Sequence, residues 1–482
     1  FRFEQPGQPA GYYDEQGRSL KRFFLRSPLR FEPRISSGFT MRRLQGEDNS
    51  AYAWVPPTGE NSCYSCKPGV TQVWLDNDAH GRSAVNLRFL TMYNGTDVYG
   101  NQSPPRRFAY NVDYGSTPLR PDLDQPYYGP GYKLDFPEVA GNCAACHDPA
   151  AALDAPYNTD PNTVSGVNLF GIHCDYCHKV SDVRLDPSTG LPYPNSPGVL
   201  SQAILRPFPE DPERYQLFFG SFDDDNVPEE DTFLPLIKES QWCAACHYGI
   251  FWDTLVYNSY GEWLESPYSD PASGSTCQQC HMPAPTVMDG EALTNVAPGR
   301  GGVERDPNTI PAHTFPGGSN AVLLQNSVTL HVDALLSGEA LRVNVTILNA
   351  RTGHHVPSDS PLREMILVVQ AVAPDGTPLA QASGPILPEW AGVGDPASGF
   401  YAGLPGQIYE KLLMELWTEL SPTGSYWNPT LVVSDNRIPA LGADTTEYTF
   451  KVPCGGEYVV AVRLLYRRAY MELMQQKVTN FI

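Results

Sequence analysis

The chain has 482 residues, too many for one ordinary core, so its length predicts two or three domains. Hydrophobic residues make up 41% and charged residues 18%, which excludes a disordered chain, and 46 prolines with 41 glycines argue against long helices. The net charge of −21 argues against nucleic acid or anionic membranes as partners, and the lack of any run of 18 apolar residues predicts no membrane span.

Residues 1–60 are predicted to form an N-terminal arm. The chain starts at Phe1 without a signal-like pattern, so we expect a processed, mature protein. Three pieces of the arm resemble the segment that precedes the catalytic domain of lysostaphin-type metallopeptidases: Tyr12–Lys21, Phe24–Leu29 and Arg34–Phe39. The zinc-ligand set of that family does not follow, so we interpret the arm as structural and expect no peptidase activity.

Residues 61–320 are predicted to form a domain defined by its cysteines. Ten of the eleven cysteines lie in five C-x-x-C pairs. Four pairs are followed at once by His and the first pair by Lys67. In chain order the pairs are Cys63 and Cys66, Cys143 and Cys146 before His147, Cys174 and Cys177 before His178, Cys243 and Cys246 before His247, and Cys277 and Cys280 before His281.

C-x-x-C-H is the motif for covalent attachment of haem. The two thiols add to the two vinyl groups of the porphyrin, and the following His becomes the proximal iron ligand. Structural zinc would pair two C-x-x-C units without needing a His after each one. A C-x-x-C disulfide is strained, and an iron–sulfur cluster needs further cysteines nearby. The spacing therefore predicts five covalently bound haem c groups, with His147, His178, His247 and His281 as proximal ligands.

A six-coordinate haem also needs a distal ligand, and six histidines remain for this role. His80 follows the first attachment site, and His173 directly precedes Cys174, from where it can reach a neighbouring haem. His313 and His354 lie in loops that give an imidazole no local structural role. We expect these four to be distal ligands.

Two further histidines are interpreted differently. His331 alternates within a strand-like stretch, which favours a place on the surface of a strand. His355 is expected to neighbour His354 rather than to bind iron itself.

Lys67 stands where the other four motifs place His. A neutral amine can bind ferric iron, and this C-x-x-C-K site resembles the catalytic haem of pentahaem cytochrome c nitrite reductases. The resemblance implies that Lys67 is the proximal ligand of an active-site haem with an open sixth position. The alternative is that Lys67 replaces a His in an electron-transfer haem, or remains in solvent.

Several stretches resemble multihaem c-type cytochromes of the hydroxylamine oxidoreductase and ammonia-oxidiser tetrahaem group. They are Cys63–Asp76 with its spacing to His80, Gly171–Val180, Tyr260–Pro283 and Gly353–Pro357. The resemblance covers roughly residues 61–365 and implies that His80, His313 and His354 are ligands. Because the group contains both carriers and enzymes, it implies no substrate.

One acidic run, Asp223–Asp231, gathers the oxygen ligands that calcium prefers. A solvated acidic loop is the favoured interpretation, and a calcium site is the alternative.

Residues 321–482 are predicted to form a β-sandwich. Strand-length apolar or alternating runs recur, and Asp375-Gly376 is a hairpin-turn signal. One helix is expected over Tyr409–Leu420. The predicted fold class is thus a mixed, loop-rich multihaem cytochrome domain with short helices around the haems, followed by this sandwich.

The sequence favours an exported pentahaem cytochrome, periplasmic, at the cell surface or extracellular, because haem c is attached outside the cytoplasm. It would pass electrons through closely packed, mostly bis-His haems to a redox partner protein or an external acceptor. One alternative is a reductase of a small nitrogen or sulfur species at the Lys67 haem. The other is a homo-oligomer, as a subunit of an extracellular cytochrome polymer.

Overall fold

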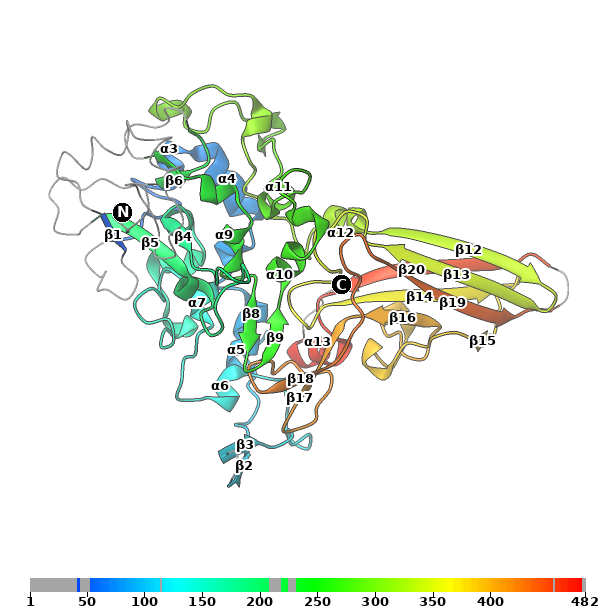
Figure 1. Cartoon of the computed structure of the whole chain (residues 1–482). Helices are drawn as coiled ribbons and strands as arrows, with labels where there is room; N and C mark the ends of the chain where they lie inside the picture. The colour runs from blue at the N-terminus through cyan, green and yellow to red at the C-terminus, as the bar shows by residue number, and fades with distance from the viewer. Residues whose placement is uncertain are drawn as a thin grey trace. The chain divides into compact units, whose positions relative to one another are not determined.

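A computed structural model describes residues 41–43, 53–112, 115–207, 218–223, 231–453 and 456–478 (Figure 1). Most of the predicted N-terminal arm lies outside these residues. So does most of the acidic run for which a calcium site is the alternative interpretation. The chain divides into two compact units. The first contains residues up to Phe89, Val139–Tyr248 and Ser275–Pro316, and the second contains Leu90–Glu138, Gly249–Gly274 and the residues from Gly317 onward. The three-part division of the sequence stays a prediction.

The first unit consists of short helices, turns and small sheets. Its α-helices are α3 (Cys63–Cys66), α4 (Pro68–Asn77), α7 (Ala144–His147), α8 (Cys174–Cys177), α9 (Gln241–Ala244) and α11 (Cys277–His281). Its sheets are β1-β5-β4 (Met41–Arg43, Gln202–Pro207, Val180–Val183), the parallel pair β6 and β7 (Phe218–Gly220, Asp231–Phe233), and β10 with β11 (Val287–Met288, Glu291–Ala292). Helices of a single turn are unstable alone, so tertiary contacts must hold most of them.

The second unit begins within α5 (Leu87–Asn94) and gathers three separate stretches of chain. Before its main sheets it has the hairpins β2–β3 (Phe108–Asn111, Gly115–Pro118) and β8–β9 (Gly249–Phe251, Thr254–Tyr257). It also has helices α6 (Tyr132–Asp135), α10 (Ser259–Leu264), α12 (Ala321–Ser327) and α13 (Met471–Lys477). No helix in the described ranges is long and apolar enough to cross a membrane.

Two antiparallel sheets of the second unit form a β-sandwich (Figure 1). One has the order β12-β13-β19-β15 (Thr329–Ser337, Ala340–Leu348, Ala443–Lys451, Gln381–Ser383), and the other β16-β14-β20 (Gly406–Tyr409, Glu364–Val372, Val459–Arg467). In β13, Leu341, Val343, Val345 and Ile347 are buried while the residues between them face outward, as a half-buried strand requires. The short helices and the sandwich together confirm the predicted fold class.

The helix expected over Tyr409–Leu420 is wrong. The chain there forms the end of β16 and then β17 (Lys411–Glu415), which pairs with β18 (Thr430–Asp435). Leu412 and Leu413 are both buried. Lys, Leu, Met and Glu are good helix formers, but pairing and burial in the tertiary structure override that weak local preference.

Candidate functional site

All five C-x-x-C pairs lie in the first unit, each on or beside one short helix. Residues three apart in a helix share a face, so each pair presents its two sulfur atoms side by side. In the fifth motif Thr276 caps α11: its hydroxyl accepts from the Gln279 N–H, and the Gln279 side chain accepts from the Thr276 N–H at 2.7 Å. This reciprocal capping holds a single turn that would otherwise fray. None of the ten cysteines is in a disulfide.

The attachment motifs lie close to one another. The side chains of Cys63 and Cys174 lie next to each other, which brings the first motif beside the third. The side chains of Cys243 and Cys277 are neighbours in the same way and bring the fourth motif beside the fifth.

A glycine links the second and fourth motifs through the backbone. The Gly198 N–H donates to the Ala245 carbonyl at 2.6 Å. A Cβ at Gly198 would come within 1.9 Å of the Ala145 carbonyl oxygen, and its φ of 57° already favours glycine. A side chain at this position would therefore push the two motifs apart.

Two histidine pairs bring a predicted proximal ligand close to a predicted distal one. The ring centroids of His178 and His313 are 6.3 Å apart with 27° between the planes. Those of His80 and His247 are 6.2 Å apart with 90° between the planes. Two imidazoles on opposite sides of one metal ion, each with a bond of about 2 Å, would have their centroids roughly 6 Å apart. Both pairs fit the axial positions of a haem iron.

In four of the predicted ligand histidines, Nδ1 already makes a hydrogen bond within the protein. Nδ1 of His80 bonds the Asp78 carboxylate at 2.9 Å, and Nδ1 of His281 bonds the Pro316 carbonyl at 2.7 Å. His178 and His313 use the carbonyls of Phe219 and Pro311 in the same way. A ring that donates through Nδ1 leaves the lone pair of Nε2 for a metal, and such outer contacts commonly orient metal-binding histidines.

His173 is fully buried and differs from these rings. Its Nδ1 accepts the Tyr176 N–H at 3.2 Å as the N-cap of α8, and its Nε2 is buried without a hydrogen-bond partner. Burial lowers the pKa of His173 to about 4, so the ring is neutral, as a metal ligand must be. Because Nδ1 accepts a hydrogen bond, the neutral ring carries its proton on Nε2, so an iron at Nε2 would have to displace that proton. The ligand role of His173 stays a prediction.

His354 belongs to the second unit, where its loop is fixed from both sides. Its Nδ1 bonds the His355 carbonyl at 2.9 Å, and its own carbonyl accepts from the Asn349 amide at 2.8 Å. The buried Glu262 carboxylate accepts from the His355 N–H and pairs with Arg437 at 2.7 Å. The carbonyl of His355 thus orients the His354 ring, and Glu262 fixes the turn that carries both.

Lys67 and His331 have distinct surroundings. The half-buried Lys67 ends α3 and precedes α4, and its N–H donates to the Cys63 carbonyl at 2.8 Å. It is the C-cap residue of α3, the position that His178 has at the end of α8. His331 is exposed on β12 beside Asp333 at 3.2 Å, the strand-surface position that its alternation suggests.

Three contacts of the site were missed by sequence reasoning. Asp78 is two residues before His80, a spacing that could have been recognised. Phe89 stacks on His147 with centroids 3.8 Å apart, and Glu262 lies 93 residues before His355. No local signal in the sequence points to either of these contacts.

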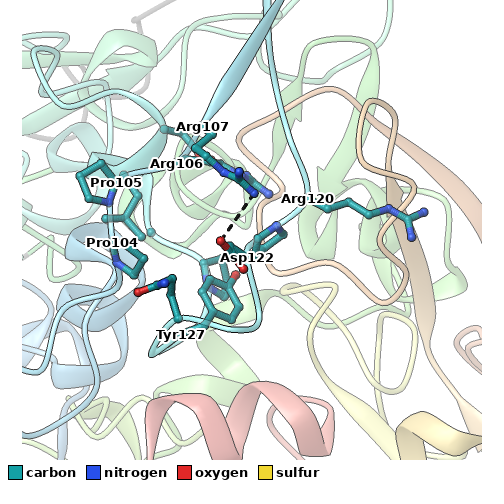
Figure 2. A pocket seen from close by; sticks show the side chains of 13 residues that line it. Pro104, Pro105, Arg106, Arg107, Arg120, Asp122 and Tyr127 are labelled. Carbon is teal, nitrogen blue, oxygen red and sulfur yellow. Dashed lines mark hydrogen bonds and ion pairs between the residues drawn. The ribbon is translucent and has the colours of Figure 1, made fainter.

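The second unit also has a pocket that holds none of the predicted site residues (Figure 2). Its lining includes Pro104, Pro105, Arg106, Arg107, Asp122 and Tyr127. The Arg106 guanidinium pairs with the Asp135 and Glu415 carboxylates at 3.0 and 3.3 Å. Because these buried charges satisfy one another, we interpret the pocket as part of the packing.

No protein-family model matches the chain. A curated protein, the peptidoglycan DD-endopeptidase ShyC of Vibrio cholerae, is 36% identical over 88 residues, which is 18% of this chain and 18% of that protein. A solved structure, a penta-haem cytochrome c552 from Thermochromatium tepidum, matches with a TM-score of 0.53 at 15% identity, over 86% of this chain and 92% of that one. The chain therefore has the fold of a multihaem c-type cytochrome.

Proposed function

We propose that the chain is a pentahaem c-type cytochrome that carries electrons. The observation that carries the proposal is the pair of facing imidazoles at His178 and His313, repeated at His80 and His247. In each pair one ring follows a C-x-x-C motif and the other comes from a distant part of the sequence. Two axial imidazoles give a low-spin, low-potential iron, which favours electron transfer over catalysis.

Five haems would be held by the ten paired cysteines. His147, His178, His247 and His281 would be their proximal ligands, with Lys67 in that position at the first site. His80 and His313 would be distal ligands through the pairs above, and His173 and His354 would serve two of the remaining haems. When bound, haem accepts and releases single electrons without large structural change.

The chain's own residues would set how each haem behaves. The carbonyls and the carboxylate that hold Nδ1 fix the rings and raise the basicity of their Nε2 atoms. The first and third motifs lie side by side, as do the fourth and fifth, so the haems that each pair of motifs holds would be neighbours. Such packing supports transfer along a series of haems rather than at one isolated site.

The proposal implies export, because haem c is attached outside the cytoplasm. The physiological partner would be a redox protein or an external electron acceptor. The net charge of −21 supports a partner that is not a nucleic acid.

The second candidate function is reduction of a small nitrogen or sulfur species at the first haem. It is favoured by one observation: Lys67 has the C-cap position that His178 has in the third motif. A weaker axial donor there would suit an iron that binds substrate on its other side.

The number of haems tests the proposal. Intact-protein mass spectrometry should find a mass above the 53.1 kDa polypeptide by five haem groups. The double variant Cys63→Ala, Cys66→Ala should lose one of the five, whereas Cys454→Ala, the matched control outside the pairs, should keep all five. If the double variant keeps five haems, Cys63 and Cys66 do not attach one. If the wild type, purified from a host that can attach haem c, carries no haem, the proposal is wrong.

A further inference from the structure

Strand β12 is a long sheet edge with little protection. It ends the order β12-β13-β19-β15 and pairs with β13 through nine residues in unbroken register (Figure 1). The opposite edge, β15, has three residues and a register shift. Proteins commonly guard edges by shortness, bulges, proline or lysine. β15 is short and irregular in register, whereas β12 is long and has no bulge, proline or lysine.

The core face of β12 is apolar, and most side chains on both faces of the strand are exposed. The register with β13 places Val332 opposite Val345 and Leu336 opposite Leu341, so both lie on the face that carries the sandwich core. They are nevertheless 38% and 44% exposed, and Leu335 on the outer face is 63% exposed. The core face of the sheet therefore continues onto β12, where the described residues leave Val332 and Leu336 partly exposed.

We propose that β12 pairs with β12 of a second copy of this chain, antiparallel and centred on Val332. A two-fold axis through that position joins the two four-stranded sheets into one continuous sheet. On the core face, Val332 then meets its own copy, Leu330 meets Ala334, and Val328 meets Leu336. Every direct pair on this face is apolar, so the exposed row becomes part of a shared core.

Charge selects this register. On the outer face, His331 and Asp333 already lie 3.2 Å apart within one strand. With the axis at Val332, each His331 faces the Asp333 of the other copy, which gives two complementary pairs. Centring the axis on Asp333 would instead oppose two carboxylates, and like charges directly opposite one another destabilise a strand pair.

The proposal concerns a surface of the sandwich and does not rest on the haem function. Each copy carries a net charge of −21, so the two copies repel at long range. Raising the ionic strength should therefore strengthen the association, because salt screens the long-range repulsion more than the short-range contacts.

Sedimentation velocity of the full haem-loaded protein tests the contact by charge exchange. We expect the wild type to sediment as a dimer. His331→Asp places carboxylates opposite carboxylates at both pairs and should weaken dimerisation about tenfold. The double variant His331→Asp, Asp333→His restores both complementary pairs and should return the dimerisation constant to within about threefold of the wild type.

Two further variants make the result specific. Ala443→Asp adds a negative charge on the outer face of β19, two strands away, and should leave the dimer unchanged. Leu336→Lys puts a charge into the shared core row and should yield monomers, with an unchanged far-ultraviolet circular dichroism spectrum showing that the β-sandwich still folds. A monomeric wild type, open-ended polymers, or a charge exchange that fails to rescue the single variant would each overturn the proposal.

Discussion

Replacing His313 by Ala should turn one low-spin haem into a high-spin haem. The ring centroid of His313 lies 6.3 Å from that of His178, and if both rings bind one iron, the substitution removes a strong-field imidazole from it. About one fifth of the low-spin absorbance should then be lost, because one of the five proposed haems would change, and the reduction potential of that haem should rise. His80→Ala should do the same at the haem proposed for His247.

The control is His331→Ala, which removes an exposed histidine from the sandwich and should leave the spectrum unchanged. Adding free imidazole to His313→Ala should restore the low-spin spectrum, because the small molecule can occupy the space of the missing ring. If both His313→Ala and His80→Ala keep five low-spin haems, the axial pairing is wrong.

Replacing Lys67 should affect the first haem and spare the other four. If Lys67 binds iron, Lys67→His should keep the haem and shift its spectrum and potential, because an imidazole replaces an amine. Lys67→Ala should leave that iron without its proximal protein ligand. Redox titration followed by absorbance resolves the one component that moves, and Lys238→Ala provides a control lysine outside the motif.

The same variants separate the carrier from the reductase. In a reductase, either change should abolish turnover with nitrite or hydroxylamine, because charge and position at that iron carry the chemistry. In a carrier, the wild type shows no such turnover and the variants alter one potential only. If Lys67→Ala changes neither the spectrum nor the potential, Lys67 is an ordinary side chain and the first haem takes its ligands elsewhere.

The attachment motifs of this chain are local in sequence, and for that reason they could be recognised. Two thiols and a histidine within five residues define an attachment site without any knowledge of the fold. The strand runs of the sandwich are equally local, since alternation in β13 follows directly from one buried face. The multihaem fold and the β-sandwich were therefore predictable.

Contacts across long stretches of sequence could not be predicted. His178 and His313 lie 135 residues apart, and no pattern in the chain pairs them rather than other histidines. Each unit gathers three separate stretches of the chain. Which stretches come together depends on packing, and no local signal in the sequence marks it. The prediction of a helix over Tyr409–Leu420 was wrong for the same reason. The conformation of that segment is set by its pairing with β18 and not by the helix preference of its own residues.

The different angles within the two imidazole pairs should make two irons magnetically distinct. At His178 and His313 the planes are only 27° apart, so both rings would overlap one d orbital of a shared iron and split it from its partner. At His80 and His247 the planes are 90° apart, so the rings would act on the two orbitals equally and leave them close in energy. Near-degenerate orbitals retain more orbital angular momentum. In the fully oxidised protein, electron paramagnetic resonance should therefore resolve a rhombic signal from the haem between His178 and His313 and a far more anisotropic one from the haem between His80 and His247.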